Sequence, residues 1–279
     1  MHYLLRDEML NYIFGKMERF FSYSRFFNPF ATLYLNFRTV RFRDAIRLPI
    51  FVYGRVDFVC LRGRILIESP ICSGMIKLGR HRDDYTLGKV SKLCLLFNES
   101  TIVFKGKCSI GDNFLLRVVD KGILTFGEYV WLGSSVSVFC FNNIEIGDYS
   151  SITFNSKLMD SNCHYIVNTD SQIVKPILGS VSIGRFNWIG NSSTIMKGCA
   201  TGDYVNVASN SLLNKSYIDL GNNILLAGSP AVKKADNVRR IFSPIIEKRV
   251  NQFYATNPNG RYVMKSVDFD DTNGLGCYF

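Results

Sequence analysis

The stretch "SIGRFNWIGNSSTIMKG", residues 182–198, places isoleucine at every sixth position and follows the first two isoleucines with glycine. A helix repeats every 3.6 residues and a strand every two, so neither explains this interval. The step of six continues downstream to Thr201, Val207 and Leu213. Upstream, the same step links three further groups of apolar residues: Ile110 and Leu116; Phe126, Leu132 and Val138; Ile146, Ile152 and Leu158.

Six residues on each face predict a triangular prism made of short parallel strands. The interval from Gly184 to Gly202 is 18 residues, which equals three faces and one complete coil. The aliphatic residue of each face points inward, and the small residue after it permits a tight corner. Such coils cannot bury their apolar side alone, so they must stack on one shared core. A sandwich of irregular strands would not keep this spacing, and we therefore predict an all-β protein with a parallel β-helix.

The pattern resembles the hexapeptide-repeat acyltransferases, and "IGRFNWIGNSSTIMKG" is similar to that family's I-G-x-x-x-W-I-G run. "LLAGSPAVKK" (225–234) is similar to the family's closing A-G-x-P-A loop. Bacterial surface-polysaccharide and maltose- or galactoside-type O-acetyltransferases are the most similar members. The resemblance implies a left-handed β-helix over residues 101–232. An N-terminal capping region would occupy residues 1–100, and a C-terminal helix and tail would occupy residues 233–279, with Ser243 and Pro244 starting the helix.

The repeat is interrupted by "MDSNCHYIVNTDSQIVKPILGSVS" (159–182), which is too long for a corner and contains His164. A long loop in a regular fold is more often functional than accidental. Imidazole titrates near neutrality, so His164 is a candidate general base, although a solvated loop histidine is the alternative. The resemblance implies the catalytic role. Asp160 either orients the imidazole, binds the acceptor or supports the corner. Cys163 is expected to be a buried, inert thiol, and the alternative is a ping-pong mechanism through an acyl-cysteine.

By resemblance, acetyl-CoA is the co-substrate, and catalysis needs no metal. The resemblance also implies a groove for the pantetheine arm and nearby cations for the phosphates. The groove would be lined by Trp188, Asn191, Ser209, Asn214 and Gly228. The cations would be Lys215, Lys233 and Lys234, whose alternative role is solvated surface charge.

Formal net charge is +10, and it is concentrated at the two ends of the chain. Residues 1–64 carry a surplus of six positive charges and residues 233–249 a surplus of four. No nucleic-acid-binding motif accompanies this charge, so anionic small ligands or a membrane surface are the expected partners. Residues 1–42 are rich in aromatics, and helical spacing would gather Phe20, Tyr23 and Phe27. This segment either caps the prism or touches the inner membrane peripherally.

The eight cysteines are scattered without a C-x-x-C pair, which indicates buried free thiols rather than disulfides or a zinc site. No long apolar run is present, and charged residues occupy the N-terminus where a signal peptide would be apolar. These features predict a cytoplasmic protein. A γ-class carbonic anhydrase has the same prism but requires three histidine ligands, and the repeat region contains only His164.

The resulting prediction is an acetyl-CoA-dependent O-acetyltransferase that acts on a saccharide hydroxyl of a cell-surface polysaccharide or glycolipid precursor. The alternatives are an amino-sugar N-acetyltransferase, a serine acetyltransferase or a non-enzymatic β-helix scaffold. Flat prism faces pack well about a three-fold axis, so we expect a homotrimer. The resemblance implies that His164 faces a groove completed by the next subunit.

Overall fold

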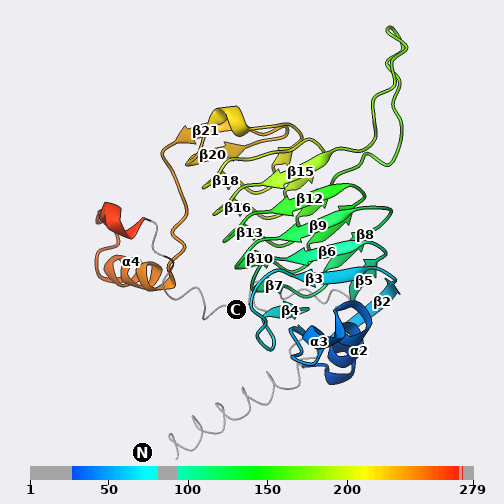
Figure 1. The fold of residues 1–279 in the computed structure, drawn as a ribbon. Coiled ribbons are helices and arrows are strands. Elements are labelled where there is room, and N and C mark those ends of the chain that lie inside the picture. Colours follow the sequence, from blue (N-terminus) through cyan, green and yellow to red (C-terminus); the bar gives the residue numbers. More distant parts are fainter. Residues whose placement is uncertain (1–26, 81–92, 270–271, 273–279) are drawn as a thin grey trace, which may run out of the picture.

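The aliphatic residues spaced six apart are buried in one continuous core. The computed structural model describes residues 27–80, 93–269 and 272. Ile189, Ile195 and Val207 are all 0% exposed, and their counterparts in the other coils are equally buried. Stacking of these coils produces a left-handed parallel β-helix (Figure 1). The predicted fold class is confirmed.

Each coil contributes strands in turn to three sheets. Sheet 1 consists of β1 (Ile50–Val52), β4 (Ile76–Leu78), β7 (Cys108–Ile110), β10 (Val130–Leu132), β13 (Ser151–Ile152), β16 (Trp188–Ile189), β18 (Asn206–Val207), β20 (Ile224–Ala227) and β21 (Val232–Asp236). Sheet 2 consists of β2 (Arg55–Leu61), β5 (Leu93–Asn98), β8 (Leu115–Val118), β11 (Ser137–Cys140), β14 (Lys157–Met159), β17 (Thr194–Met196) and β19 (Leu212–Leu213). Sheet 3 consists of β3 (Arg64–Ile67), β6 (Thr101–Phe104), β9 (Ile123–Phe126), β12 (Asn143–Ile146) and β15 (Ser180–Ile183). Among the described strands, β20 and β21 pair antiparallel and the others pair in parallel.

The chain turns from sheet 1 to sheet 2, from sheet 2 to sheet 3, and back to sheet 1, at edges called here the 1–2, 2–3 and 3–1 edges. The register keeps equivalent residues stacked, because Ile146 pairs with Ile183 and Ile152 with Ile189. Side chains at one edge therefore form columns along the prism. Tyr149, Phe186 and Tyr204 occupy one such column at the 3–1 edge, with ring centroids 4.7 and 4.8 Å apart.

The glycine after the inward residue is required by the close approach of neighbouring coils. A Cβ atom on Gly184 would lie 2.2 Å from the carbonyl oxygen of Gly202. The left-handed backbone conformation of the corner belongs instead to the residue two positions later, Phe186, with φ of 55°. Two different residues of the corner therefore meet its two requirements: Gly184 lacks a side chain, and Phe186 adopts the positive φ.

Thr201 interrupts the aliphatic pattern because it belongs to a buried polar cluster. Its hydroxyl accepts hydrogen bonds from the Gly184 N–H (3.0 Å) and from Asn187 Nδ2 (2.6 Å). Asn187 Oδ1 in turn accepts a hydrogen bond from the Val205 N–H at 2.6 Å. Both side chains are buried, so an aliphatic residue at position 201 would leave the Asn187 amide without this partner.

The β-helix begins earlier than the expected boundary at residue 101. β1, β2 and β3 form a first coil over residues 50–67 and pair in parallel with β4, β5 and β6. At the other end, β21 extends sheet 1 beyond residue 232. The aliphatic residues and corner glycines mark the later coils in the sequence, whereas the first coil has irregular strands, including a register shift between Phe58 and Cys60 in β2.

Helices lie at both ends of the described chain. α2 (Pro29–Thr39) and α3 (Phe42–Ala45) pack at the end of the prism where β1 lies, and Leu35 of α2 enters the core (Figure 1). η2 (Ile218–Leu220) precedes β20, and η3 (Ser266–Asp268) follows α4 (Pro244–Thr256). Ser243 caps α4 by accepting a hydrogen bond from the Ile246 N–H, as predicted. The helix predicted through Phe20 and Tyr23 lies outside the described residues.

Four of the free thiols are buried as predicted: those of Cys94, Cys108, Cys140 and Cys199. Burial raises the pKa of the Cys94 thiol to about 11 and that of the Cys199 thiol to about 12. These thiols are therefore protonated and unreactive near neutral pH. Cys72 and Cys163 are exposed, in contrast to the burial expected for Cys163.

Replacing Gly184 with alanine should lower the free energy of unfolding by about 2 kcal/mol, because the new Cβ overlaps the backbone of the next coil. Gly179→Ala is the matched control, since its Cβ would lie 3.2 Å from the Lys197 Cβ and 3.4 Å from its nearest backbone atom, Gly198 N. Thermal denaturation of both variants measures the difference. Equal melting temperatures would contradict the proposed close-approach constraint.

Candidate functional site

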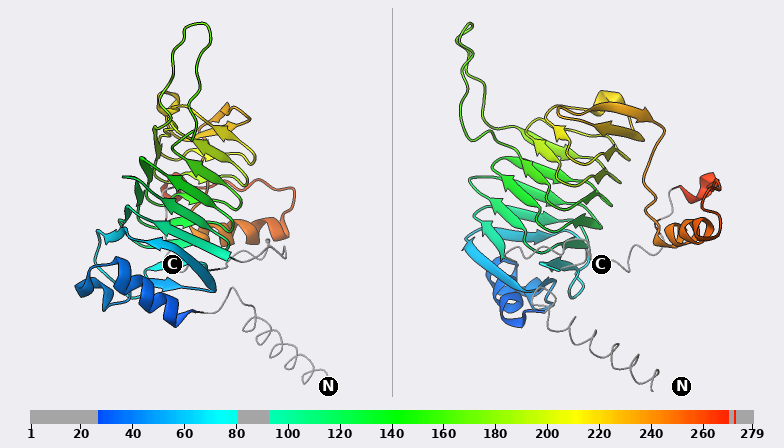
Figure 2. Two further views of the ribbon diagram at one scale, coloured as in Figure 1. Left: turned by 90° about the vertical axis from the view of Figure 1, so that its right-hand side faces the viewer. Right: turned by 180° about the vertical axis from the view of Figure 1, so that it is seen from behind.

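Residues 160–179 leave the prism at the 2–3 edge as a projecting hairpin, called here the arm (Figures 1 and 2). Antiparallel bridges join Ser161 to Leu178 and Val167 to Val174. The interruption predicted from the sequence is therefore an extended element that stands away from its own prism. Among the described residues, His164 is the only histidine, and it is exposed on this arm.

His164 lines a cavity of about 480 Å³ that extends along the arm and is also lined by Asn162, Lys175 and Lys197. Lys197 Nζ donates a hydrogen bond to the carbonyl oxygen of Pro176, which ties the arm to the corner after β17. The imidazole thus shares this cavity with two lysine side chains, and it is exposed in the single chain. A general base in this position needs additional groups to enclose its substrate.

Asp160, at the root of the arm, is 0% exposed and supports the backbone of the preceding coil. Its two carboxylate oxygens accept hydrogen bonds from the N–H groups of Phe141 (2.9 Å) and Asn142 (2.8 Å). Burial, and secondly the charge of Asp160, raise the pKa of the Cys140 thiol. These contacts favour the corner-supporting role among the alternatives that the sequence left open, and a catalytic role for Asp160 stays a prediction.

The residues expected to hold the donor are distributed over several parts of the prism. Asn191, Ser209 and Gly228 lie on successive coils at the 1–2 edge, where the Asn210 N–H bonds to the Asn191 carbonyl oxygen at 2.8 Å. Asn214 and Lys215 follow β19 and are exposed at the 2–3 edge, on the side of the arm.

Lys233 and Lys234 are exposed on β21, and Lys233 Nζ lies 2.9 Å from the Asp236 carboxylate. Trp188 lies on sheet 1. In the single chain, His164 and Lys197 therefore line one cavity, whereas Asn191 and Ser209 lie at a different edge.

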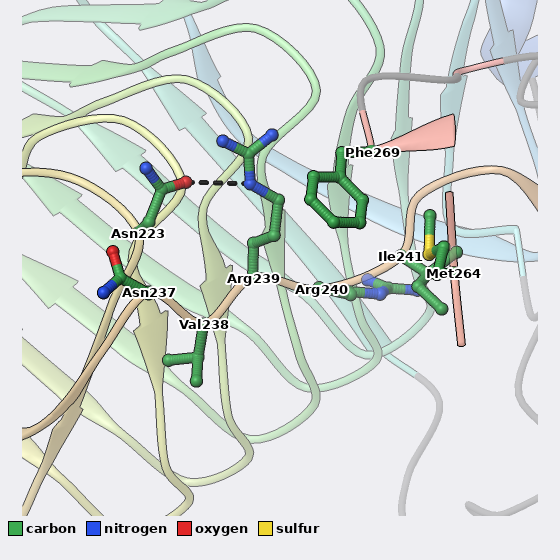
Figure 3. A pocket seen from close by; sticks show the side chains of 8 residues that line it. All are labelled: Asn223, Asn237, Val238, Arg239, Arg240, Ile241, Met264 and Phe269. Atoms are coloured by element: carbon green, nitrogen blue, oxygen red, sulfur yellow. Dashed lines mark hydrogen bonds between the residues drawn. The ribbon is translucent and has the colours of Figure 1, made fainter. Parts of the chain in front are cut away.

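Trp188 lines a cavity of about 420 Å³ on sheet 1, which also includes Asn206 and Leu225. A second cavity of about 480 Å³ shares Val238, Arg239 and Arg240 with the first and extends to Met264 and Phe269 (Figure 3). The shared residues make these cavities neighbouring parts of one groove, called here the arginine groove. Two guanidinium groups and an indole ring in one groove suit a ligand that combines phosphates with a planar ring.

Both arginines are held by aromatic rings. The guanidinium of Arg239 lies 4.0 Å from the centroid of the Tyr204 ring, and its Nε donates to Asn223 Oδ1 at 2.8 Å. Arg239 thereby closes the aromatic column of the 3–1 edge. The guanidinium of Arg240 lies 5.9 Å from the Trp188 ring centroid and 5.3 Å from that of Phe242.

The sequence did not identify these two arginines as site residues, and the positive surplus of residues 233–249 was the only available signal. No group of three or more His, Cys, Asp or Glu side chains suited to a metal ion occurs within the described ranges. None of the helices in those ranges is long and apolar enough to cross a membrane.

Replacing Asp160 with alanine should lower the free energy of unfolding by about 3 kcal/mol, because two backbone N–H groups lose their buried carboxylate acceptor. His164→Ala is the matched control, since its side chain is exposed. Thermal melting should place Asp160→Ala several degrees below the wild type and leave His164→Ala unchanged. If both variants melt like the wild type, the supporting role of Asp160 is wrong.

Comparison with known proteins identifies relatives that are named as acetyltransferases. The chain is 29% identical over 132 residues to WcaF of Escherichia coli (strain K12), which is named as a colanic acid biosynthesis acetyltransferase. The aligned region covers 44% of this chain and 66% of WcaF. It is 24% identical over 159 residues to WbbJ of the same strain, named as a lipopolysaccharide biosynthesis O-acetyl transferase, with 53% of this chain and 80% of WbbJ covered. The chain thus spans just under two thirds of WcaF.

Among solved structures, the polySia-specific acetyltransferase NeuO aligns with a TM-score of 0.45 and 17% identity, over 75% of this chain and 99% of NeuO. That score is too low to establish a shared fold by itself, so the fold assignment rests on the strand pairing described above. No protein-family model matches the chain. The sequence relatives and the repeat together confirm the resemblance to hexapeptide-repeat acyltransferases.

Proposed function

We propose that this chain, a β-helix protein of the hexapeptide-repeat type, transfers an acetyl group from acetyl-CoA to a saccharide hydroxyl. The acceptor is a building block of a surface polysaccharide or a lipid-linked glycan. The observation that carries the proposal is the placement of His164 on an arm that interrupts a regular prism. Two relatives named for polysaccharide and lipopolysaccharide acetylation support the same conclusion.

In this mechanism, His164 acts as the general base. Its imidazole takes the proton of the acceptor hydroxyl while the hydroxyl oxygen forms a bond to the thioester carbonyl carbon. The tetrahedral intermediate then collapses, its carbon–sulfur bond breaks, and the imidazolium returns the proton to the departing thiolate of CoA. General-base assistance of this kind is worth about 10²–10⁴-fold in rate.

The arginine groove is the proposed position of the nucleotide part of the donor. Arg239 and Arg240 are positioned by ring contacts, so contacts between their guanidinium groups and phosphates would cost little additional conformational entropy. Trp188, Asn191, Ser209 and Gly228 follow from the resemblance as contacts of the pantetheine arm. Lys215, Lys233 and Lys234 remain candidate phosphate contacts, although Lys233 already pairs with Asp236.

We further propose that the active form is a homotrimer in which the arm of one subunit completes the groove of the next. The arm exposes large apolar side chains, namely Tyr165 (70%), Ile166 (68%), Val167 (51%), Ile173 (60%) and Val174 (51%). A two-stranded hairpin is marginally stable in water without a surface to pack on. Packing of the arm against a neighbouring prism would bury these residues. It would also place His164 beside a sheet of the neighbouring subunit, although in its own subunit the equivalent sheet lies on a different face of the prism from His164.

A cytoplasmic location fits the free, exposed thiols of Cys72 and Cys163, because such thiols persist in reducing compartments. The alternatives make different predictions for one assay. Incubation with acetyl-CoA and a panel of sugars, amino sugars and serine, followed by mass spectrometry, identifies the acceptor. A scaffold protein would acetylate none of them and would not be stabilised by CoA in a thermal-shift measurement.

His164→Ala should reduce acetyl transfer by at least 100-fold, because the general base is lost. The melting temperature and the affinity for CoA should remain unchanged, since the side chain is exposed on the arm. Turnover is measured by release of free CoA with the acceptor found above. A variant that keeps more than about a tenth of the wild-type rate would remove His164 from the mechanism.

Mixing two inactive variants tests the shared site. His164→Ala removes the base, and Ser209→Trp blocks the groove on a different edge. Random assembly of equal amounts should restore about a quarter of the wild-type rate, because an intact arm meets an intact neighbouring groove in about one site of four.

Each variant reassembled on its own is the control and should stay inactive. A mixture that also stays inactive, together with a monomeric mass by light scattering, would contradict the shared site.

A further inference from the structure

Helix α2 turns its apolar side away from the protein. Phe30 (83%), Leu33 (44%), Tyr34 (54%) and Phe37 (48%) are exposed, and their spacing of three and four residues places them on one face. A surface helix ordinarily presents such a face to the core and its polar face to water. The orientation of α2 is the reverse of this rule.

Hydrogen bonds to strand β1 fix this orientation. Asn36 Nδ2 donates to the Ile50 carbonyl oxygen at 2.7 Å, and Asn36 Oδ1 accepts from the Ile50 N–H at 3.2 Å. Thr32 Oγ1 accepts from the Val52 N–H at 2.9 Å. Thr32 and Asn36 are both buried, so α2 satisfies the free edge of sheet 1 with its polar face. Rotating the apolar face inward would break these bonds.

The exposed apolar area continues onto α3 and is accompanied by positive charge. Phe42 is 73% exposed and Ile46 is 59% exposed, next to the end of α2. Residues 38–47 contain four arginines and one acidic residue, Asp44. The arginines are exposed, and they are Arg38, Arg41, Arg43 and Arg47. Together with Phe30, Leu33, Tyr34, Phe37, Phe42 and Ile46 they form what is called here the cap surface.

We propose that the cap surface binds an anionic lipid bilayer. Aromatic side chains partition into the headgroup region, where their rings are in a partly apolar environment. Arginines beside them attract anionic headgroups and keep the rings at the lipid surface. The sequence suggested that residues 1–42 either cap the prism or touch the membrane. In this proposal α2 does both, because its polar face caps the prism and its apolar face contacts the bilayer. This inference does not depend on the proposed acetyl transfer.

The charge of the cap surface argues against two other occupants, which are a second copy of the chain and residues 1–26. A two-fold contact with a second copy would place four arginines against four arginines, with one acidic residue on each side. Residues 1–26 carry four basic and three acidic side chains, so they have no negative surplus to neutralise the cap surface. An anionic bilayer supplies both an apolar phase and negative charge.

Co-sedimentation of the full chain with vesicles tests the proposal. Vesicles of phosphatidylcholine with about a third phosphatidylglycerol should bind the protein, and pure phosphatidylcholine vesicles should bind it far more weakly. Arg41→Gln/Arg43→Gln/Arg47→Gln should lower the partition coefficient by about 100-fold, at about fivefold for each charge near the surface. Phe30→Gln/Phe37→Gln should also weaken binding while preserving the hydrogen bonds of Thr32 and Asn36.

Helix α4 and its neighbours provide matched controls of the same chemistry. Ile245→Gln/Tyr254→Gln removes two exposed apolar side chains, and Lys248→Gln/Arg261→Gln/Lys265→Gln removes three exposed charges. Both controls should bind vesicles like the wild type.

The proposal is overturned if the wild-type chain does not bind, or if the cap variants bind as well as the controls. It is also overturned if light scattering shows that Phe30→Gln/Phe37→Gln dissociates an oligomer, because a second copy would then occupy the surface. All variants should keep the wild-type rate of acetyl transfer to a soluble acceptor.

Discussion

Parallel hydrogen bonding between successive coils is the constraint on which the rest of this structure depends. Each coil pairs with the next in the same register, so that inward residues lie above inward residues and corners above corners. The spacing between paired strands is about 4.8 Å. A side chain cannot fit between two backbones at some of these corners, which explains Gly184. The same spacing lets aromatic rings stack face to face along the 3–1 edge.

The repeat was predictable from the sequence because its residues satisfy local requirements. Ile183, Ile189 and Ile195 are buried as expected, and Ser243 caps the C-terminal helix. The first coil escaped recognition because β2 carries a register shift and its corner lacks the aliphatic-glycine pair. Here the pairing with later coils, rather than the local pattern, determines the structure.

Site residues were harder to predict, since their roles depend on contacts distant in sequence. Asp160 precedes His164 by four residues, yet its carboxylate bonds to the backbone of the preceding coil. Arg239 and Arg240 belong to the segment after the last coil, and their positions follow from rings of Tyr204 and Trp188. The direction of the arm also has no local sequence signal. Its apolar side chains have no partner surface within the described chain, so the complete site belongs to the assembly that we propose.

Because all coils pair in the same way, the number of coils can change without changing the residues at the cap or at the arm. The cap at β1 and the root of the arm at β14 are separated by the strands β4, β7 and β10 of sheet 1 before β13 is reached. These four steps correspond to about 19 Å along the prism axis. Duplication or loss of a whole intervening coil would change this distance in increments of about 4.8 Å and preserve both ends. The number of intervening coils thus sets the distance between the cap and the arm, and gain or loss of coils during evolution would change that distance.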